Sequence, residues 1–259
     1  MKVLIHPTPE AGADCVAALI AARLRRRSAP VLGLATGGTM EAVYARLIAQ
    51  HRAGRCSFAQ TETFNLDEYV GLAPDHPCSY WHYMRAQLFD HVDIAPGRYH
   101  LPRGDAPDPE AEAARYEAAI LAAGDIGLQL LGLGANGHIG FNEPTSSLSS
   151  LTRIKTLTRS TREANARFFD RPEDVPRLAI TMGIGTILRA EEVVLLAYGA
   201  GKARAAAAMI EGPLSAACPA SVLQMHRRAT VVLDEAAAAE LKLRDYYEDI
   251  HPEGRDRPI

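Results

Sequence analysis

Short apolar runs alternate with stretches of helical periodicity along almost the whole chain, and this alternation most constrains the fold. The runs at 30–35, 125–133 and 193–198 are rich in apolar residues and short, which is typical of parallel strands buried on both faces. Parallel strands need crossover helices, and no linker rich in Pro, Gly or Ser divides the chain. We therefore predict one α/β domain over residues 1–250, with an open, mostly parallel sheet and helices on both faces, followed by a loose tail at 251–259.

The same patterns predict helices over 10–27, 79–91 and 235–247, and strands over 153–158 and 178–182. The helix at 79–91 is most simply explained by packing. Residues 160–169, within the segment 157–176, are predicted to form a helix or a mobile lid, and the two prolines in 169–176 indicate a hinge.

Composition limits the possible partners of the chain. A formal net charge of −3 argues against a general attraction to nucleic acid, so any bound anion must be held by local groups. No apolar run approaches the about 18 residues of a membrane span. Four scattered cysteines without metal-ligand spacing indicate free thiols in a reducing, cytoplasmic setting: Cys15, Cys56, Cys78 and Cys218.

The stretch Leu130–Pro144 begins as an apolar strand, breaks into four glycines and then offers His138 and Glu143. Glycine is used where the backbone needs a positive φ or a close approach to a ligand. Ligands bind at the carboxyl edge of open α/β sheets, so this loop is a candidate ligand site. Taken alone, His138 is more often a buried histidine bonded to a carbonyl.

Two strand-to-helix turns are candidate phosphate sites. Thr36–Thr39 has a glycine pair before a helix, and Lys202 follows glycines at a second such turn. Free N–H groups at a helix N-terminus bind phosphate. Each pattern is weak by itself, because a tight turn or a solvated lysine explains it equally well.

Asp67 and Glu68 stand together at the end of a strand. Neighbouring strand residues point to opposite faces, so one carboxylate can face a site while the other is solvated or paired. The pattern alone does not choose between them.

Several motifs in one order resemble the glucosamine-6-phosphate deaminases. They are Leu34–Thr39, Phe64–Leu72, Gly137–Pro144, Ser146–Leu148, Arg153–Thr158 and Ala164–Phe169. The resemblance covers nearly the whole chain. It implies a Rossmann-like fold without a metal or other cofactor, and the conversion of the sugar phosphate glucosamine 6-phosphate and water to fructose 6-phosphate and ammonia.

The resemblance also assigns roles. Asp67 would take the C2 proton and return it at C1, and His138 would open the sugar ring, oriented by Glu143 and Asn136. An imidazole suits this step because it titrates near neutral pH. The phosphate would be held by Thr36, Gly37, Gly38, Thr39, Arg167 and Lys202.

Many family members carry Asp where this chain has Asn136. An amide can hydrogen-bond an imidazole but cannot stabilise its cation by charge, so we expect a shifted pH profile rather than lost activity.

The resemblance further implies a homo-oligomer, with a hexamer as one family state, that N-acetylglucosamine 6-phosphate activates between subunits. The matching residues are Met1, Ser146, Arg153, Lys155 and Thr156. The tail tyrosine of regulated members has no clear match, although Tyr246 and Tyr247 are displaced candidates.

Three alternatives remain open. A galactosamine-6-phosphate deaminase is poorly separated by sequence. A 6-phosphogluconolactonase shares the fold and the phosphate turn, but it does not need the motifs around Asp67 and Glu143. A non-catalytic sugar-phosphate sensor would require loss of Asp67 or His138, and both are present.

Overall fold

The computed structural model describes residues 1–26 and 30–256. Its centre is a seven-stranded sheet in the order β1-β10-β9-β6-β2-β3-β5, in which every neighbouring pair is parallel. The predicted α/β class is therefore confirmed. The strands are β1 (Lys2–His6), β2 (Val31–Leu34), β3 (Glu62–Asn65), β5 (Tyr99–His100), β6 (Leu128–Gly132), β9 (Glu192–Ala197) and β10 (Ala229–Asp234).

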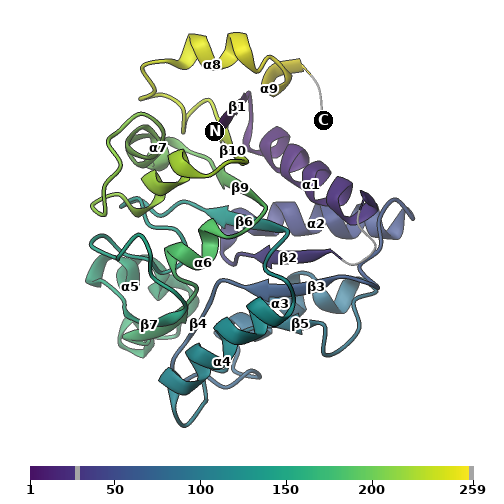
Figure 1. Cartoon of the computed structure of the whole chain (residues 1–259), viewed down its shortest axis with the longest axis vertical. Coiled ribbons are helices and arrows are strands. Elements are labelled where there is room, and N and C mark those ends of the chain that lie inside the picture. The colour runs from purple at the N-terminus through teal and green to yellow at the C-terminus, as the bar shows by residue number, and fades with distance from the viewer. Residues whose placement is uncertain (27–29, 257–259) are drawn as a thin grey trace.

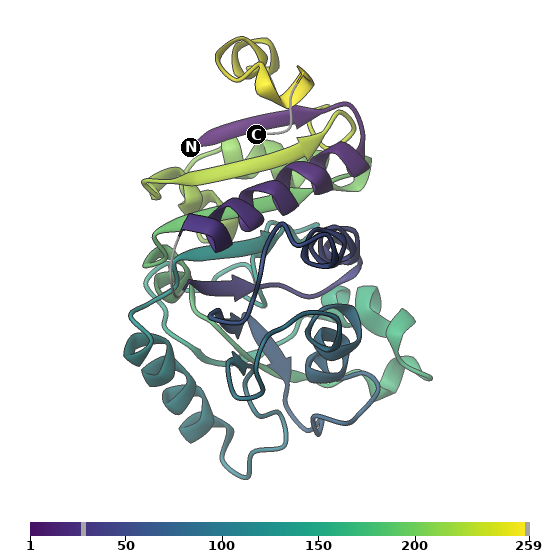
Figure 2. The ribbon, with the colours of Figure 1, turned by 90° about the vertical axis from the view of Figure 1, so that its right-hand side faces the viewer.

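Helices cover both faces of this sheet, as the alternating pattern predicts (Figure 1). The helices α1 (Pro9–Arg26) and α2 (Gly38–Arg52) pack together on one face, and Figure 2 shows α1 crossing in front of the strands. The other face carries α6 (Ile184–Leu188), α7 (Ala203–Ile210) and the 3-10 helix η5 (Pro219–Met225). Side chains of the central strands are therefore buried on both sides, among them Leu32, Leu130 and Val231.

A second, three-stranded antiparallel sheet was not predicted. It has the order β4-β8-β7, with β4 (Asp67–Tyr69), β8 (Leu178–Thr181) and β7 (Arg153–Thr156). The chain passes from one sheet to the other at Leu66, whose N–H donates to Leu34 O while its carbonyl accepts from the N–H of Met182. Asp67 therefore stands where the two sheets meet.

The remaining helices connect these layers. They are α3 (Tyr80–Gln87), η1 (Phe89–His91), α4 (Pro109–Ala122), α5 (Arg159–Asn165), η2 (Ala166–Phe168), η3 (Pro172–Asp174) and η4 (Ala200–Lys202). In Figure 2 the arrowheads of the parallel strands point to the side on which the green α5 lies. The predicted lid segment therefore lies at the carboxyl edge of the sheet.

The helix predicted over 235–247 is wrong over 235–243 and confirmed over 244–247. Residues 235–240 form turns, and α8 (Arg244–Ile250) begins later. Ala237 and Ala238 are fully buried, and the Glu211 carboxylate accepts the N–H groups of Lys242 and Leu243, which redirects the chain before α8. Packing and these bonds outweigh the helical propensity of the alanines.

The tail predicted as loose is packed over part of its length. Residues Glu253–Asp256 form α9, which lies against β1. Lys2 pairs with Glu253, and a Cβ at Gly254 would stand 2.8 Å from the carbonyl oxygen of Ile5. Residue 27 of the first predicted helix and residues 257–259 lie outside the described residues.

Candidate active site

A cavity of about 630 Å³ opens at the carboxyl edge of the parallel sheet. Its walls come from the ends of β2, β3 and β6, from the lid and from η4. The structure brings nine of the predicted catalytic and phosphate-binding residues to these walls: Thr36, Gly37, Gly38, Thr39, Asp67, Asn136, His138, Arg167 and Lys202. Residues more than 160 positions apart therefore meet around one space.

The phosphate turn joins β2 to α2. Gly37 has φ 102°, a conformation that L side chains rarely adopt, and α2 begins at Gly38. The first N–H groups of a helix have no intrahelical acceptor, so those of Gly38 and Thr39 are available to an anion.

Two cations complete this end of the cavity. Burial lowers the pKa of Lys202, and the nearby charge of Arg167 lowers it further. Lys202 is half-buried and Arg167 is exposed, and two like charges close together are destabilised until an anion neutralises them. The arrangement fits a phosphate dianion.

The His138 loop depends on two glycines. A Cβ at Gly134 would come within 2.4 Å of the imidazole ring, so the ring lies directly against the Gly134 backbone. Gly137 has φ 83°, and its N–H donates to the carbonyl of Gly134 over 2.9 Å. A side chain at Gly134 would displace the ring from the cavity.

Glu143 lies behind His138 and is 2% exposed. Its Oε2 is 3.4 Å from Nδ1 of His138. Burial alone would raise the pKa of Glu143, but the nearby His138 and the hydrogen bonds from Thr161 and Asn136 outweigh it and lower the pKa to about 2. Thr158 also donates to Oε1 over 3.1 Å. The carboxylate is therefore ionised and fixed, as an orienting partner of an imidazole must be.

Sequence reasoning missed Thr158 and Thr161 as partners of Glu143. Thr158 is the N-cap of α5, and its hydroxyl accepts the N–H of Thr161. The Thr-x-x-Thr pattern at the start of the lid helix could have indicated a helix N-cap. It gives no sign that both hydroxyls also bond the carboxylate of Glu143.

Asn136 differs from the expectation that it bonds the imidazole. Its Nδ2 donates to Oε2 of Glu143 over 2.8 Å, and its Oδ1 accepts the backbone N–H of His138 over 3.2 Å. The amide therefore acts on His138 through Glu143 and the loop backbone.

Asp67 is 5% exposed and faces the cavity. Burial raises the pKa of Asp67 to about 8, the Glu68 carboxylate adds to the rise, and a hydrogen bond from the N–H of Phe141 opposes it. A Cβ at Gly140 would lie 3.4 Å from Oδ2 of Asp67, so the His138 loop passes directly beside this carboxyl.

Glu68 points away from the cavity and is fully buried rather than solvated. It accepts the N–H groups of Tyr69, Tyr80 and Trp81 at 2.8, 3.1 and 3.0 Å. Burial raises the pKa of Glu68 to about 7 against these three bonds. The side chain ties β4 to the first turn of α3, and this contact was not predicted.

The lid contributes α5 and η2 to the cavity, with Arg167 but not Arg162 among the lining residues. Phe169 packs against Tyr69, with the ring centroids 5.7 Å apart. Tyr80, predicted as a packing residue, also lines the cavity, and its hydroxyl is 3.2 Å from that of Tyr69.

The residues matched to the regulatory site are only partly assembled. Arg153 and Lys155 lie on β7, and Nη1 of Arg153 donates to Oδ1 of Asn142 over 2.8 Å. Ser146 is buried and Thr156 is exposed. Met1 lies beside β1, far from β7 in Figure 1.

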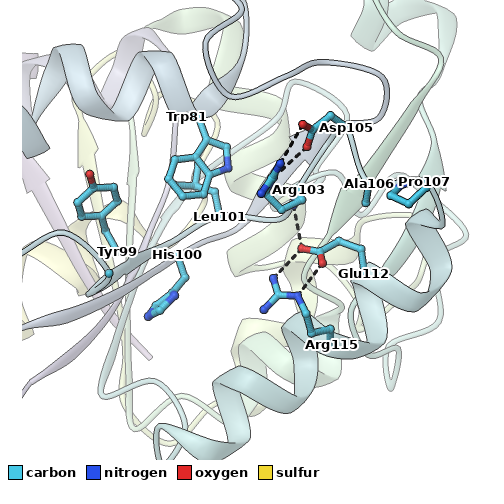
Figure 3. A pocket seen from close by; sticks show the side chains of 11 residues that line it. Trp81, Tyr99, His100, Leu101, Arg103, Asp105, Ala106, Pro107, Glu112 and Arg115 are labelled. Atoms are coloured by element: carbon cyan, nitrogen blue, oxygen red, sulfur yellow. Dashed lines mark hydrogen bonds and ion pairs between the residues drawn. The ribbon is translucent and has the colours of Figure 1, made fainter.

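A second cavity of about 680 Å³ lies beside β5 (Figure 3). Its two arginines are each paired: Arg103 with Asp105 through two contacts of 2.9 Å, and Arg115 with Glu112 at 2.6 and 2.7 Å. The predicted catalytic and phosphate-binding residues do not line it. We therefore place the site in the first cavity.

Residues 1–26 and 30–256 contain no group of three or more His, Cys, Asp or Glu side chains placed to hold a metal ion. Within the same ranges, no helix is long and apolar enough to cross a membrane.

Known proteins share both the sequence and the fold. The family model described as glucosamine-6-phosphate isomerases/6-phosphogluconolactonase matches residues 8–232. A glucosamine-6-phosphate deaminase of Hahella chejuensis is 56% identical over 253 residues, covering 98% of this chain and 97% of that protein. One of Rhodopirellula baltica is 54% identical over 94% of this chain and 97% of its own length.

Solved structures agree with these relatives. A monomeric glucosamine-6-phosphate deaminase superposes with a TM-score of 0.91 at 45% identity, covering 93% of this chain and 100% of that chain. A 6-phosphogluconolactonase from Trypanosoma brucei reaches a TM-score of 0.73 at 20% identity, over 93% and 98% of the two chains, and shows the fold alone.

Proposed function

The chain belongs to the family of glucosamine-6-phosphate isomerases and 6-phosphogluconolactonases, and we propose that it converts glucosamine 6-phosphate and water to fructose 6-phosphate and ammonia. One observation carries the proposal. A buried carboxyl of raised pKa, a histidine backed by a fixed carboxylate and a two-cation phosphate clamp all face one cavity. The reaction requires these three parts.

Binding begins with the phosphate. The turn at Thr36–Thr39, Arg167 and Lys202 hold it at one side of the cavity. Because the phosphate is remote from the reacting carbons, its binding energy can orient the sugar for the later steps.

Ring opening comes next. His138 moves a proton at the ring oxygen, and Glu143 fixes the imidazole from behind. The ionised Glu143 also stabilises the imidazolium that forms when the proton is taken up.

Asp67 then performs the isomerisation. Its carboxylate removes the proton from C2 and returns it at C1, and water hydrolyses the resulting imine to release ammonia. A base of pKa about 8 is well matched to this proton transfer, since proton affinity and ionised fraction are balanced near neutral pH. The amide Nδ2 and carbonyl Oδ1 of Asn136 hold Glu143 and the His138 backbone meanwhile.

The alternatives are not favoured. Relatives at 50–56% identity are named glucosamine-6-phosphate deaminase, whereas the lactonases share the fold at about 20%. A sensor would have no need for a buried base beside a fixed His–Glu pair.

An assay of ammonia and fructose 6-phosphate from glucosamine 6-phosphate tests the proposal. Wild type should release both in equal amounts, and Asp67→Asn should be reduced at least about 10²-fold, the usual contribution of a general base. Asp75→Asn, an exposed residue between β4 and α3, is the matched control. A wild type that releases no ammonia, or an unimpaired Asp67→Asn, would refute it.

Regulation forms part of the proposal. Four regulatory residues, three of them on β7, would bind N-acetylglucosamine 6-phosphate together with Met1 of a neighbouring subunit, because Met1 of the same chain lies far from β7 (Figure 1). The four are Ser146, Arg153, Lys155 and Thr156. The bond from Arg153 to Asn142 links this place to the residue before Glu143. The supposed assembly is a homo-oligomer, with a hexamer as one candidate, although one solved relative is monomeric.

Light scattering and rate curves test regulation. An oligomer whose rate rises with the acetylated sugar phosphate, and an Arg153→Ala variant that has lost the response, would support it. A monomer whose rate curve is hyperbolic and does not respond to the acetylated sugar phosphate would refute the proposed regulation.

The four cysteines are free thiols, which supports the cytoplasmic location expected from the sequence.

A further inference from the structure

Three tyrosine hydroxyls hold carbonyl groups of the phosphate turn Thr36–Thr39 and of the residue before it. Tyr83 donates to Gly37 O over 2.9 Å and Tyr198 donates to Gly38 O over 3.4 Å, while Tyr44 donates to Ala35 O. The donors come from α3, from the residue after β9 and from α2. Two of the three hydroxyls therefore contact the turn itself, and the third contacts the strand end that leads into it.

In the part of the chain that the structure describes, no side chain packs against the Cβ side of the two glycines in this turn. A Cβ at Gly37 or Gly38 would meet no atom of the described residues within 4 Å. Glycine is also the residue with the greatest backbone freedom, so two in sequence can rotate their peptide planes readily. The Gly37 carbonyl also accepts the backbone N–H of Met40 over 2.9 Å, and the tyrosine hydroxyls add side-chain contacts that oppose such rotation.

The position of a carbonyl determines where the next N–H points. In a planar trans peptide the C=O and N–H directions are opposite. Fixing Gly37 O and Gly38 O therefore fixes the N–H groups of Gly38 and Thr39, which open α2 and lack intrahelical acceptors. These are the donors that a phosphate would use.

The phenols are suited to this task. Burial raises the pKa of Tyr83 and of Tyr44, so both keep their protons and remain donors. A water molecule could satisfy the same carbonyls, but a phenol on a packed ring holds its oxygen in one place.

We propose that Tyr83 and Tyr198, with Tyr44 on the carbonyl that precedes the turn, are positioning residues that preorganise the turn for the phosphate of the substrate. The inference rests on the proposed function and goes beyond it, since these tyrosines touch the backbone of the turn rather than the reacting atoms. Preorganised donors bind without first losing conformational freedom, so the effect should appear in affinity.

Tyr83→Phe is the main test, because it keeps the ring and removes one hydroxyl. Loss of one neutral hydrogen bond predicts an about fivefold rise in KM for glucosamine 6-phosphate, with kcat within about twofold. Calorimetric titration with inorganic phosphate should show the same loss of affinity. Turnover of glucosamine without its phosphate should not change.

Tyr198→Phe should act in the same direction but less strongly, because its bond is longer. Tyr99→Phe is the control, since its ring stacks on Phe89 with centroids 4.4 Å apart, away from the turn. Tyr44 is fully buried, so its variant is not used.

Unchanged phosphate affinity in Tyr83→Phe would overturn the inference, as would a fall in kcat at constant KM or an equal loss with unphosphorylated glucosamine. A wild type that does not bind inorganic phosphate would overturn it as well. If wild type binds phosphate but releases no ammonia, the proposed reaction fails, and the titrations still decide the role of the tyrosines.

Discussion

Asp67, the carboxyl that we propose as the base, should lower the stability of the folded protein, and Asp67→Asn should restore it. Burial raises the pKa of Asp67 from 3.8 to about 8. Below pH 3.8 both folded and unfolded states are protonated, so the residue has no effect there. As the pH rises toward 8, the unfolded chain releases a proton that the folded protein keeps, and stability falls.

The magnitude follows from this difference. Between pH 3.8 and pH 7 lie roughly three pH units, each equivalent to about 1.4 kcal/mol, which sets an upper limit of ~4 kcal/mol. Asparagine has nearly the same shape and no charge to desolvate. We therefore expect Asp67→Asn to be inactive and yet more stable than wild type by up to ~4 kcal/mol at pH 7 and by less than about 1 kcal/mol at pH 4.

Urea unfolding followed by circular dichroism at pH 4, 5.5 and 7 measures this difference, provided that the slopes agree between the proteins. The ionised Glu143 is present in wild type and in the variant, so its contribution to the free energy of unfolding cancels in the difference. Asp75→Asn serves as the exposed control. A variant no more stable than wild type at pH 7, or a gain that does not depend on pH, would refute the reasoning.

Three further predictions concern the site. First, kcat/KM should fall as the pH drops below about 8, because the carboxylate of Asp67 must be ionised to act as a base. Glu68→Gln removes a like charge, so it should move this acidic limb of the pH profile to lower pH. An acidic limb at the same pH in both proteins would contradict the prediction. Second, Asn136→Asp would place a carboxylate where an amide now donates to Glu143 over 2.8 Å, so the pH profile of kcat/KM should change, and a profile identical to wild type would argue against this position. Third, Lys202→Met should lower kcat/KM for glucosamine 6-phosphate by about 10- to 100-fold, which is the contribution of a charged hydrogen bond. The kcat/KM for unphosphorylated glucosamine should not change. An equal loss on both substrates would show that Lys202 does not bind the phosphate.

Much of the fold was predictable because its signals are local. The apolar runs of β2, β6 and β9 are short and nearly continuous, broken in β6 by Gln129, and such runs are typical of strands buried on both faces of a sheet. The glycines around His138 indicated a ligand loop for a similar reason. Gly137 and Gly140 have positive φ values, which glycine adopts readily whatever its tertiary surroundings.

The second sheet could not be predicted from such signals. Its strands β4 and β8 are more than a hundred residues apart, and the antiparallel pairing of Asp67 with Thr181 leaves no local periodicity. The helix predicted near the end of the chain failed over 235–243 for the opposite reason, because a strong local signal was overridden by tertiary contacts. Its alanines have strong helical propensity, but buried packing and the Glu211 carboxylate determine the turns there.

By itself, the sequence determined which chemical groups stand at the ends of which strands: the glycine turn, the paired acids, and the histidine followed by a glutamate. Tertiary structure alone decided what each group can do. Glu68 became a buried anchor of α3, Asp67 a buried carboxyl of raised pKa, and Asn136 a partner of Glu143 rather than of the imidazole. The physical reason is that strand and turn patterns depend on neighbours in the chain, whereas desolvation and hydrogen bonding depend on whatever the fold places within a few ångströms.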